Sequence, residues 1–362
     1  MNSVRSAWWV AFACVLLGVV LTAVGICVGS TGLENVLAPL WNPAHDPAQT
    51  RMAEQIVWDI RLPRTLGAWA AGALLGLAGA VAQGLFRNPL ADPYLLGSAS
   101  GASLGVALAL AAMGGSAGML GGTMMNEALA ASVFSSSVWV RLGLTGSAFV
   151  GSALAVFLTL ALSRGVGHTL RLLLAGVVVG VVLGAMTEMV LVLSPDSLRD
   201  MRAFVLGSTT FVGWTSCGLM ASVWLVCVLA SALLARVLDG LSLGDATALS
   251  LGLPVAPRRA ALVVVLALAT GTAVAQTGLI AFVGLAAPHL VRSMVKITHA
   301  HLMALASLVG GVLLMAADTL ARGLVAPQEL PVGVLTAVLG GGYLLWLMHR
   351  GQAYKAAAGG NA

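Results

Sequence analysis

The chain has 362 residues, of which 59% are hydrophobic and 9% are charged, and its mean hydropathy is +0.99. A soluble protein carries about 25% charged residues, so this composition predicts an integral membrane protein and excludes a sizeable separate soluble domain. The formal net charge is +5, but no basic run is interleaved with aromatic residues, and a nucleic-acid partner is not expected.

Ten apolar segments are predicted to cross the bilayer as helices, since each approaches the ~20 residues that a span needs. They form a single domain, residues 1–362, with an all-α fold. The run after Arg5 is interpreted as a retained first helix, with a cleaved signal peptide as the alternative. The segments are 7–29, 64–83, 93–113, 142–162, 170–193, 214–236, 259–277, 279–295, 301–321 and 332–349.

The connections between these segments contain several shorter elements. A surface helix is expected near 50–60, and residues 114–141 can hold a partial helix. Residues 194–207 are too short and too charged to span, so they predict a short helix along the outer surface. Ser194 or Asp196 can cap this helix and Gly207 can end it.

The distribution of Lys and Arg predicts that both chain ends lie inside. With the N-terminus inside, eleven of the 18 basic residues fall in inner connections, as the positive-inside rule favours. The number of arginines in the outer connections, seven, is larger than the positive-inside rule predicts. Their position therefore needs another explanation.

Residues 278–292 are the most informative stretch. This apolar segment is interrupted by Pro288, His289 and Arg292. In lipid, proline leaves a backbone carbonyl unpaired and a charge needs a partner. The segment is therefore expected to be bent and to be covered by neighbouring helices.

The inner connection 237–257 predicts a short helix over 245–251, capped by Ser242 or Asp245 and broken by Gly252. Its apolar residues have too few partners within the loop to form a core. It is therefore a candidate docking surface for a cytoplasmic protein, with an interfacial helix resting on lipid as the alternative. The candidate residues are Ser242, Leu243, Gly244, Asp245, Ala248, Leu249, Leu251 and Gly252.

Three outer arginines are candidates for gripping carboxylates on a partner protein. Arg61 and Arg64 begin the second span, and Arg322 ends the ninth. The planar guanidinium pairs bidentately with carboxylate. The alternative is that these side chains only reach for the interface. Asp318 lies four residues before Arg322 and can pair with it.

Two further polar features lie in the turn 83–97 and in the fifth segment. In the turn 83–97, Asp92 is expected to cap a third span that begins at Pro93, which is a structural role. Glu188, flanked by Met186 and Met189, lies within the fifth segment. A carboxylate inside the membrane is a functional candidate, either lining a path or hydrogen-bonded within the bundle.

No cofactor, metal or catalytic site is predicted. The chain has no Gly-rich phosphate loop ending in Gly-Lys-Ser/Thr, so it is not expected to bind ATP itself. The four cysteines form no Cys-x-x-Cys pair and are interpreted as small hydrophobes. The six histidines show no ligand spacing.

Together these motifs resemble the permease subunit of the type II ABC importers for iron–siderophores, haem and cobalamin, from about Arg61 to Leu347. The motifs that carry the resemblance are Arg61-Leu-Pro-Arg64, Asn88-Pro-Leu-Ala-Asp-Pro93, Arg171-Leu-Leu-Leu-Ala-Gly176, Gly278 to Arg292, and Glu329-Leu-Pro-Val-Gly-Val-Leu-Thr336.

The resemblance implies a homodimer in the bacterial inner membrane, two cytoplasmic ATPase subunits that use the ATP, and a periplasmic binding protein. It implies that the ATPases dock on the inner connection and that the binding protein meets Arg61, Arg64 and Arg322. The fifth and tenth spans resemble those that line the path, with Met186, Glu188 and Met189 as candidates. Residues Gly167, His168 and Thr169 match the position of the cytoplasmic gate.

The stretch 83–93 looks most similar to the haem-importing branch, and a ferric siderophore or cobalamin is the alternative cargo. A secondary transporter driven by an ion gradient, and a channel or scaffold, are alternatives of other classes. A secondary transporter predicts paired charges within the membrane, and Glu188 is the one strong candidate.

Overall fold

The computed structural model describes residues 2–29, 32–33, 47–119, 138–163 and 169–359, and these are almost entirely helical. The first helix is followed by a minimal antiparallel pair, β1 (Val28–Gly29) and β2 (Gly32–Leu33). The bounds of the long helices are α1 (Asn2–Cys27), α4 (Leu62–Phe86), α5 (Ser98–Met119), α7 (Val138–Leu162), α8 (Thr169–Leu193), α10 (Trp214–Ser242), α12 (Val255–Thr277), α14 (His299–Gly323) and α15 (Val332–Gly359).

Shorter helices connect them. Their bounds are α3 (Pro47–Gln55), η1 (Ile56–Arg61), η2 (Pro93–Leu96), η3 (Pro195–Ser197), α9 (Leu198–Leu206), α11 (Asp245–Ser250) and α13 (Val283–Met294). Each of the ten predicted segments corresponds to one of the long helices or to α13. In the described part of the chain, seven helices are long and apolar enough to cross a membrane, so the number of spans stays a prediction.

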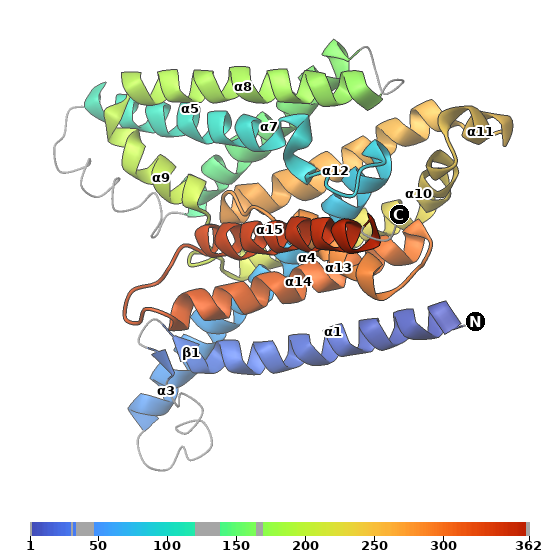
Figure 1. The fold of residues 1–362 in the computed structure, drawn as a ribbon. Coiled ribbons are helices and arrows are strands. Elements are labelled where there is room, and N and C mark those ends of the chain that lie inside the picture. The colour runs from blue at the N-terminus through green and yellow to red at the C-terminus, as the bar shows by residue number, and fades with distance from the viewer. Residues whose placement is uncertain (1, 30–31, 34–46, 120–137, 164–168, 360–362) are drawn as a thin grey trace.

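Helix α4 is the centre of the fold, and nearly all of its side chains are buried. It is surrounded by α10, α12, α13 and α14 (Figure 1). Glycines permit this packing: a Cβ at Gly72 would overlap the carbonyl of Gly310, and one at Gly76 would overlap that of Ala306. Small residues bring helix backbones together in this way in membranes, where no hydrophobic force drives helices to associate.

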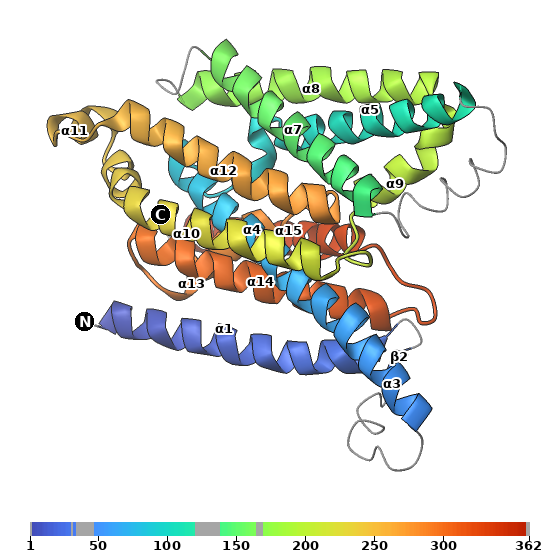
Figure 2. The same cartoon turned by 180° about the vertical axis from the view of Figure 1, so that it is seen from behind.

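A second group of helices, α5, α7 and α8, lies on one side of this bundle (Figures 1 and 2). The contact between α5 and α7 is again made by glycine. A Cβ at Gly101 would overlap the carbonyl of Gly151, and one at Gly105 would overlap that of Ser147. Helix α8 packs against α5 and α7 and exposes much of its apolar surface.

The two ends of the molecule differ. Both views place the start of α1, the end of α15 and α11 toward one end, which we call the α11 end (Figures 1 and 2). Helices α3 and α9 lie toward the opposite end, which we call the α9 end. The predicted orientation requires both chain ends and α11 to lie on one side of the membrane and α9 to lie on the other, and the two ends of the molecule have this arrangement. The assignment of the α11 end to the cytoplasm stays a prediction.

The third span begins later than predicted. Asp92 does cap Tyr94, with its Oδ1 2.8 Å from the Tyr94 N–H, but the helix that begins at Pro93 is the single 3₁₀ turn η2. Gly97, at φ 77°, ends this turn, and the span begins at Ser98. The helix predicted near 50–60 is present as α3 and η1, and it runs on into α4.

The eighth segment is also shorter than predicted. Residues 278–282 are not helical, because Gly278 and Phe282 both have positive φ, and α13 begins only at Val283. Pro288 lies inside this helix and is buried, so neighbouring helices cover it as expected. For 194–207, α9 ends at Gly207 as predicted, but neither Ser194 nor Asp196 caps it.

Candidate functional site

Four charged side chains form a compact group at the α9 end, which we call the outer cluster: Arg64, Asp318, Arg322 and Glu329. Asp318 is fully buried and pairs with both arginines, at 3.1 Å from Arg64 Nη2 and 2.7 Å from Arg322 Nη2. Glu329 pairs with Arg64 Nη1 at 3.0 Å. Two positive and two negative charges therefore balance, which is the condition under which buried charges are tolerated.

The outer cluster joins segments that are distant in the sequence. Arg64 comes from the first turn of α4, Asp318 and Arg322 from the last turns of α14, and Glu329 from the connection to α15. The Thr209 hydroxyl, from the connection between α9 and α10, donates to Asp318 Oδ1, and the Thr210 hydroxyl donates to Glu329. The cluster thus fixes two connections to the ends of two buried helices.

The end of α1 is held by two of the predicted arginines. Arg61 Nη1 donates to the carbonyl of Ile26 at 2.9 Å, and Arg322 Nη1 donates to those of Gly25 and Val28. Because main-chain carbonyls accept these bonds, α1 is joined to the bundle through its last turn and β1.

The three arginines therefore do not form an exposed patch in this chain. Arg61 and Arg64 are 7% exposed, and Arg322 is 1% exposed. The predicted pairing of Asp318 with Arg322 is confirmed. Docking of a partner on these residues stays a prediction, and the accessible member of the cluster is Glu329, which sequence reasoning named only as part of a motif.

Three glycines bring together the end of α9, the connection between α12 and α13, and the start of α15, next to this cluster. The chain turns at Gly207 and Gly278, with φ of 68° and 69°, and Gly333 lies in the first turn of α15. A Cβ at Gly333 would overlap the carbonyls of Leu206 and Leu279. The Leu279 N–H donates to the Phe204 carbonyl at 3.1 Å, so this junction is built from main-chain contacts.

At the α11 end, the predicted short helix is α11, but its capping was predicted wrongly. Ser242 is the last residue of α10 and its hydroxyl donates back to the carbonyl of Asp239. Asp245 is the first residue of α11, and Gly244, with φ 105°, occupies the position before it. The helix ends at Ser250, one residue before the predicted end, and Gly252 (φ 74°) reverses the chain.

Helix α11 divides its apolar residues between two faces. Ala248 is fully buried against the bundle, while Leu249 and Leu251 are 61% and 62% exposed. Leu243, just before the helix, is also exposed. The loop therefore presents leucines to its surroundings, as a docking surface requires.

Two carboxylates fix the inner connection to other helices. Asp239, near the end of α10, accepts from the main-chain N–H of His299 at 3.0 Å and lies 2.7 Å from its Nδ1. Asp245 lies 3.1 Å from Arg259 Nη2 and 3.5 Å from Arg87 Nη2. Sequence reasoning missed these partners, because they come from α4, α12 and α14.

The interrupted segment 278–292 finds partners for its polar groups. Arg292 Nη1 donates to Gln83 Oε1 on α4, and Gln83 Nε2 donates to the carbonyl of Leu285 at 3.2 Å. The Tyr94 hydroxyl donates to the carbonyl of Ile280. The charge of Arg292 was predicted to need a partner, and that partner is the buried side chain of Gln83.

The predicted path residues lie on α8. Met186, Glu188 and Met189 are exposed on this helix, and within the described residues Glu188 has no ion pair or hydrogen bond. Thr169 is the first residue of α8. Gly167 and His168 lie outside the described residues. Whether this exposed face lines a path stays a prediction.

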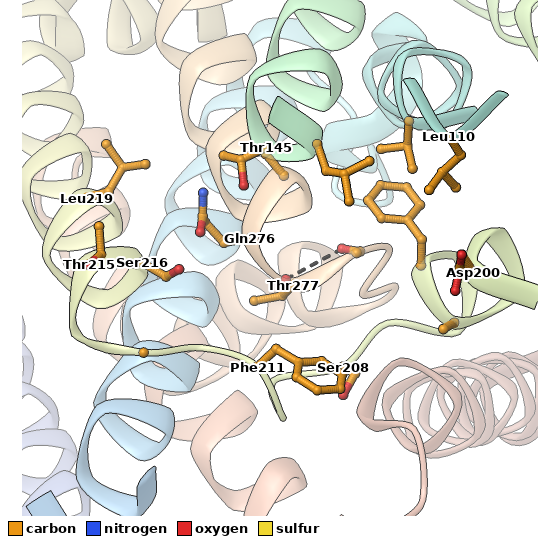
Figure 3. A pocket seen from close by; sticks show the side chains of 17 residues that line it. Leu110, Thr145, Asp200, Ser208, Phe211, Thr215, Ser216, Leu219, Gln276 and Thr277 are labelled. Carbon is orange, nitrogen blue, oxygen red and sulfur yellow. Dashed lines mark hydrogen bonds between the residues drawn. The ribbon is translucent and has the colours of Figure 1, made fainter. Parts of the chain in front are cut away.

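One cavity of about 180 Å³ lies at the α9 end, between α5, α7, α9, α10 and α12. Figure 3 shows Gln276 of α12 between Thr145 of α7 and Ser216 of α10. Burial raises the pKa of the Asp200 carboxyl, which also lines it, while Arg199 opposes that shift. Among the described residues, no three His, Cys, Asp or Glu side chains gather as a metal site would require.

Comparison with known proteins agrees with this geometry. Residues 14–350 match the model of the FecCD transport family. The chain is 39% identical to the hemin transport system permease protein HmuU of Yersinia pestis, over 86% of this chain and 87% of that protein. It is 38% identical to the vitamin B12 import system permease protein BtuC of Pectobacterium atrosepticum, over 83% and 84%.

Among solved structures, the chain is similar to one of a metal-chelate type ABC transporter in an inward-facing conformation. The TM-score is 0.76 with 28% identity, covering 94% of this chain and 98% of that one. The match spans nearly every element described above. The chain therefore belongs to the FecCD transport family and is a multi-pass membrane permease of the ABC importer type.

Proposed function

We propose that this chain is the transmembrane subunit of an ATP-driven importer that moves haem across the bacterial inner membrane into the cytoplasm. The observation that carries this proposal is α11, a short helix fixed by Asp245 on one side and exposing Leu249 and Leu251 on the other. A separate ATPase is expected to bind there. The identity with the hemin permease favours haem, and the nearly equal identity with the vitamin B12 permease keeps cobalamin as the alternative.

The proposed assembly contains two copies of this chain, two ATPase subunits and one periplasmic binding protein. The exposed apolar faces of α8 and α15 are candidates for lining a path between the two copies, since Val181, Met189 and Val338 each expose about two-thirds of their surface. Helix movement after ATP binding would then open this path to one side and close it to the other, as in other two-state switches.

The cargo is tested by uptake into liposomes that contain the permease, its ATPase and its binding protein. Haem, cobalamin and a ferric siderophore are offered side by side, with and without ATP. Uptake of haem alone supports the full proposal, and uptake of another cargo replaces haem but keeps the importer. Uptake that follows an imposed ion gradient and needs no ATP would favour a secondary transporter.

Replacing Leu249 with Asp is expected to reduce the amount of ATPase that co-purifies by about tenfold or more, the effect of losing a central apolar contact in an interface. The measurement is the ratio of ATPase to permease after affinity purification. Met52→Asp is the control, because Met52 is equally exposed on α3 at the other end. Equal recovery with both variants would contradict docking on α11.

Docking of the binding protein needs a mild substitution, because Arg64 and Arg322 are paired internally and their charge reversal would disturb folding. Arg61→Gln removes the charge that holds the Ile26 carbonyl at the end of α1, and it is expected to weaken binding of the loaded binding protein about tenfold, as the loss of a positioned charge beside an interface does. Binding is measured by titration at two salt concentrations. Arg51→Gln, an exposed arginine on α3, is the control, and a larger effect there would move the docking surface to α3.

A further inference from the structure

The Asp245 carboxylate connects three helices at the α11 end. It belongs to the first residue of α11, and its Oδ1 lies 3.1 Å from Nη2 of Arg259 on α12. The same oxygen lies 3.5 Å from Nη2 of Arg87, the residue that ends α4. The Arg259 side chain is only 4% exposed, whereas those of Asp245 and Arg87 are about 40% exposed.

Both arginines are held in fixed positions. Arg87 has a left-handed conformation, with φ 49°, and its N–H donates to the carbonyls of Gln83 and Gly84. A non-glycine residue adopts this conformation only where its surroundings impose it. Arg259 lies in the second turn of α12, on the same face as the buried Val255 and Leu262, and is itself buried. A force on the Asp245 carboxylate would therefore act on the ends of α4 and α12.

The main-chain connections of α11 are poorly suited to carry such a force. Gly244 and Gly252 flank the helix, both with positive φ, and a Cβ at either position would meet no atom within 4 Å. These glycines are therefore needed for their backbone conformation, and no side chain braces them. Within the described residues, the ion pairs of α11 are those of Asp245.

A continuous series of contacts leads from Arg87 into the bundle. Gln83 lies one turn before Arg87 on α4 and bonds both to Arg292 and to the carbonyl of Leu285 on α13. The connection that leads into α13 meets α9 and α15 at the glycine junction at the α9 end. Movement of α4 at Arg87 therefore has a direct structural route to α13.

We propose that Asp245 is the positioning residue through which displacement of α11 is passed to α4 and α12. This inference rests on the proposed function, in which the ATPase moves α11. Its role differs from that of the exposed leucines, which bind the ATPase: Asp245 faces Arg87 and Arg259 and connects the docked helix to the permease.

The test compares Asp245→Asn, Arg259→Gln and the double variant in the complete transporter. Each is expected to lower the cargo moved per ATP about tenfold, within the range of allosteric coupling. Arg259→Gln, which changes a buried residue outside the docking surface, is expected to keep ATPase co-purification and basal hydrolysis near wild type. The double variant should be no worse than Asp245→Asn alone, because that substitution already removes the ion pair with Arg259. Asp245→Glu should restore coupling, and Asp196→Asn, an exposed acid at the α9 end, should have no effect.

A second readout separates this inference from the proposed function. Hydrogen exchange is measured with and without ATP and vanadate, and in the wild type both α11 and residues 83–87 should change. In Asp245→Asn, α11 should still respond and residues 83–87 should not. The inference is overturned if residues 83–87 respond equally in the variant, or if Arg259→Gln loses the ATPase. Absence of ATP-dependent uptake by the wild type would instead contradict the proposed function.

Discussion

Replacing Asp318 with alanine is expected to destabilise the permease by about 3–5 kcal/mol, the cost of removing one partner from a buried ion pair. Asp318 is fully buried and accepts from Arg64, Arg322 and the Thr209 hydroxyl. Without it, two guanidinium groups share the single carboxylate of Glu329, which contacts Arg64 but is partly exposed. One uncompensated positive charge would stay in the protein interior.

The measurement is thermal unfolding of the purified protein in detergent, together with the folded yield. Asp318→Asn, which keeps the shape and can still accept hydrogen bonds, should lose less stability than Asp318→Ala. Asp196→Ala removes an exposed carboxylate at the same end and serves as the control. A melting temperature for Asp318→Ala equal to that of the control would show that the outer cluster does not stabilise the fold.

Replacing Gly79 with alanine is expected to separate α4 from α13 and to cost about 1–3 kcal/mol or more, as overpacking of a close contact does. A Cβ at Gly79 would overlap the carbonyl of Gly284, which is part of the main chain of α13. Gly284 cannot move away from α4, because it packs against Pro93. The strain would therefore displace α13, which carries Arg292.

The matched control is Gly218→Ala on α10, where a Cβ meets no atom within 4 Å. That substitution should be neutral or stabilising, since alanine is favoured over glycine in a helix by about 1 kcal/mol. Thermal stability and ATP-dependent uptake are measured for both variants. Equal uptake and stability for Gly79→Ala and Gly218→Ala would contradict the close approach of α4 and α13.

The features that could be predicted from the sequence are those that depend on residues close together in the chain. The membrane class follows because lipid requires long apolar runs, and each of the ten apolar segments became a helix. The pairing of Asp318 with Arg322 was predictable because residues four apart share one helix face, and it is present. Gly207 was predicted to end α9, and it does so with a positive φ.

Boundaries failed where local signals competed. Asp92 and Pro93 do start a helix, but Gly97 ends it after one turn, and the long helix starts again at Ser98. Ser242 and Asp245 are both residue types that cap helices, and either could have capped α11. Instead, Ser242 is the last residue of α10, and Asp245 pairs with Arg259. Side chains that can cap a helix also bind distant partners, and the tertiary structure selects between these uses.

Local sequence patterns were enough to predict a membrane protein with ten apolar segments, a short helix in the connection 237–257, and arginines near the start of the second segment and the end of the ninth. What those arginines contact depends on the packing of the helices. Arg64 meets Glu329, which lies 265 positions later, and Arg87 and Arg259 converge on Asp245 from two other helices. The physical reason is that apolar spans specify where helices form, while the close approach of glycines decides which helices pack together and so which buried charges become partners.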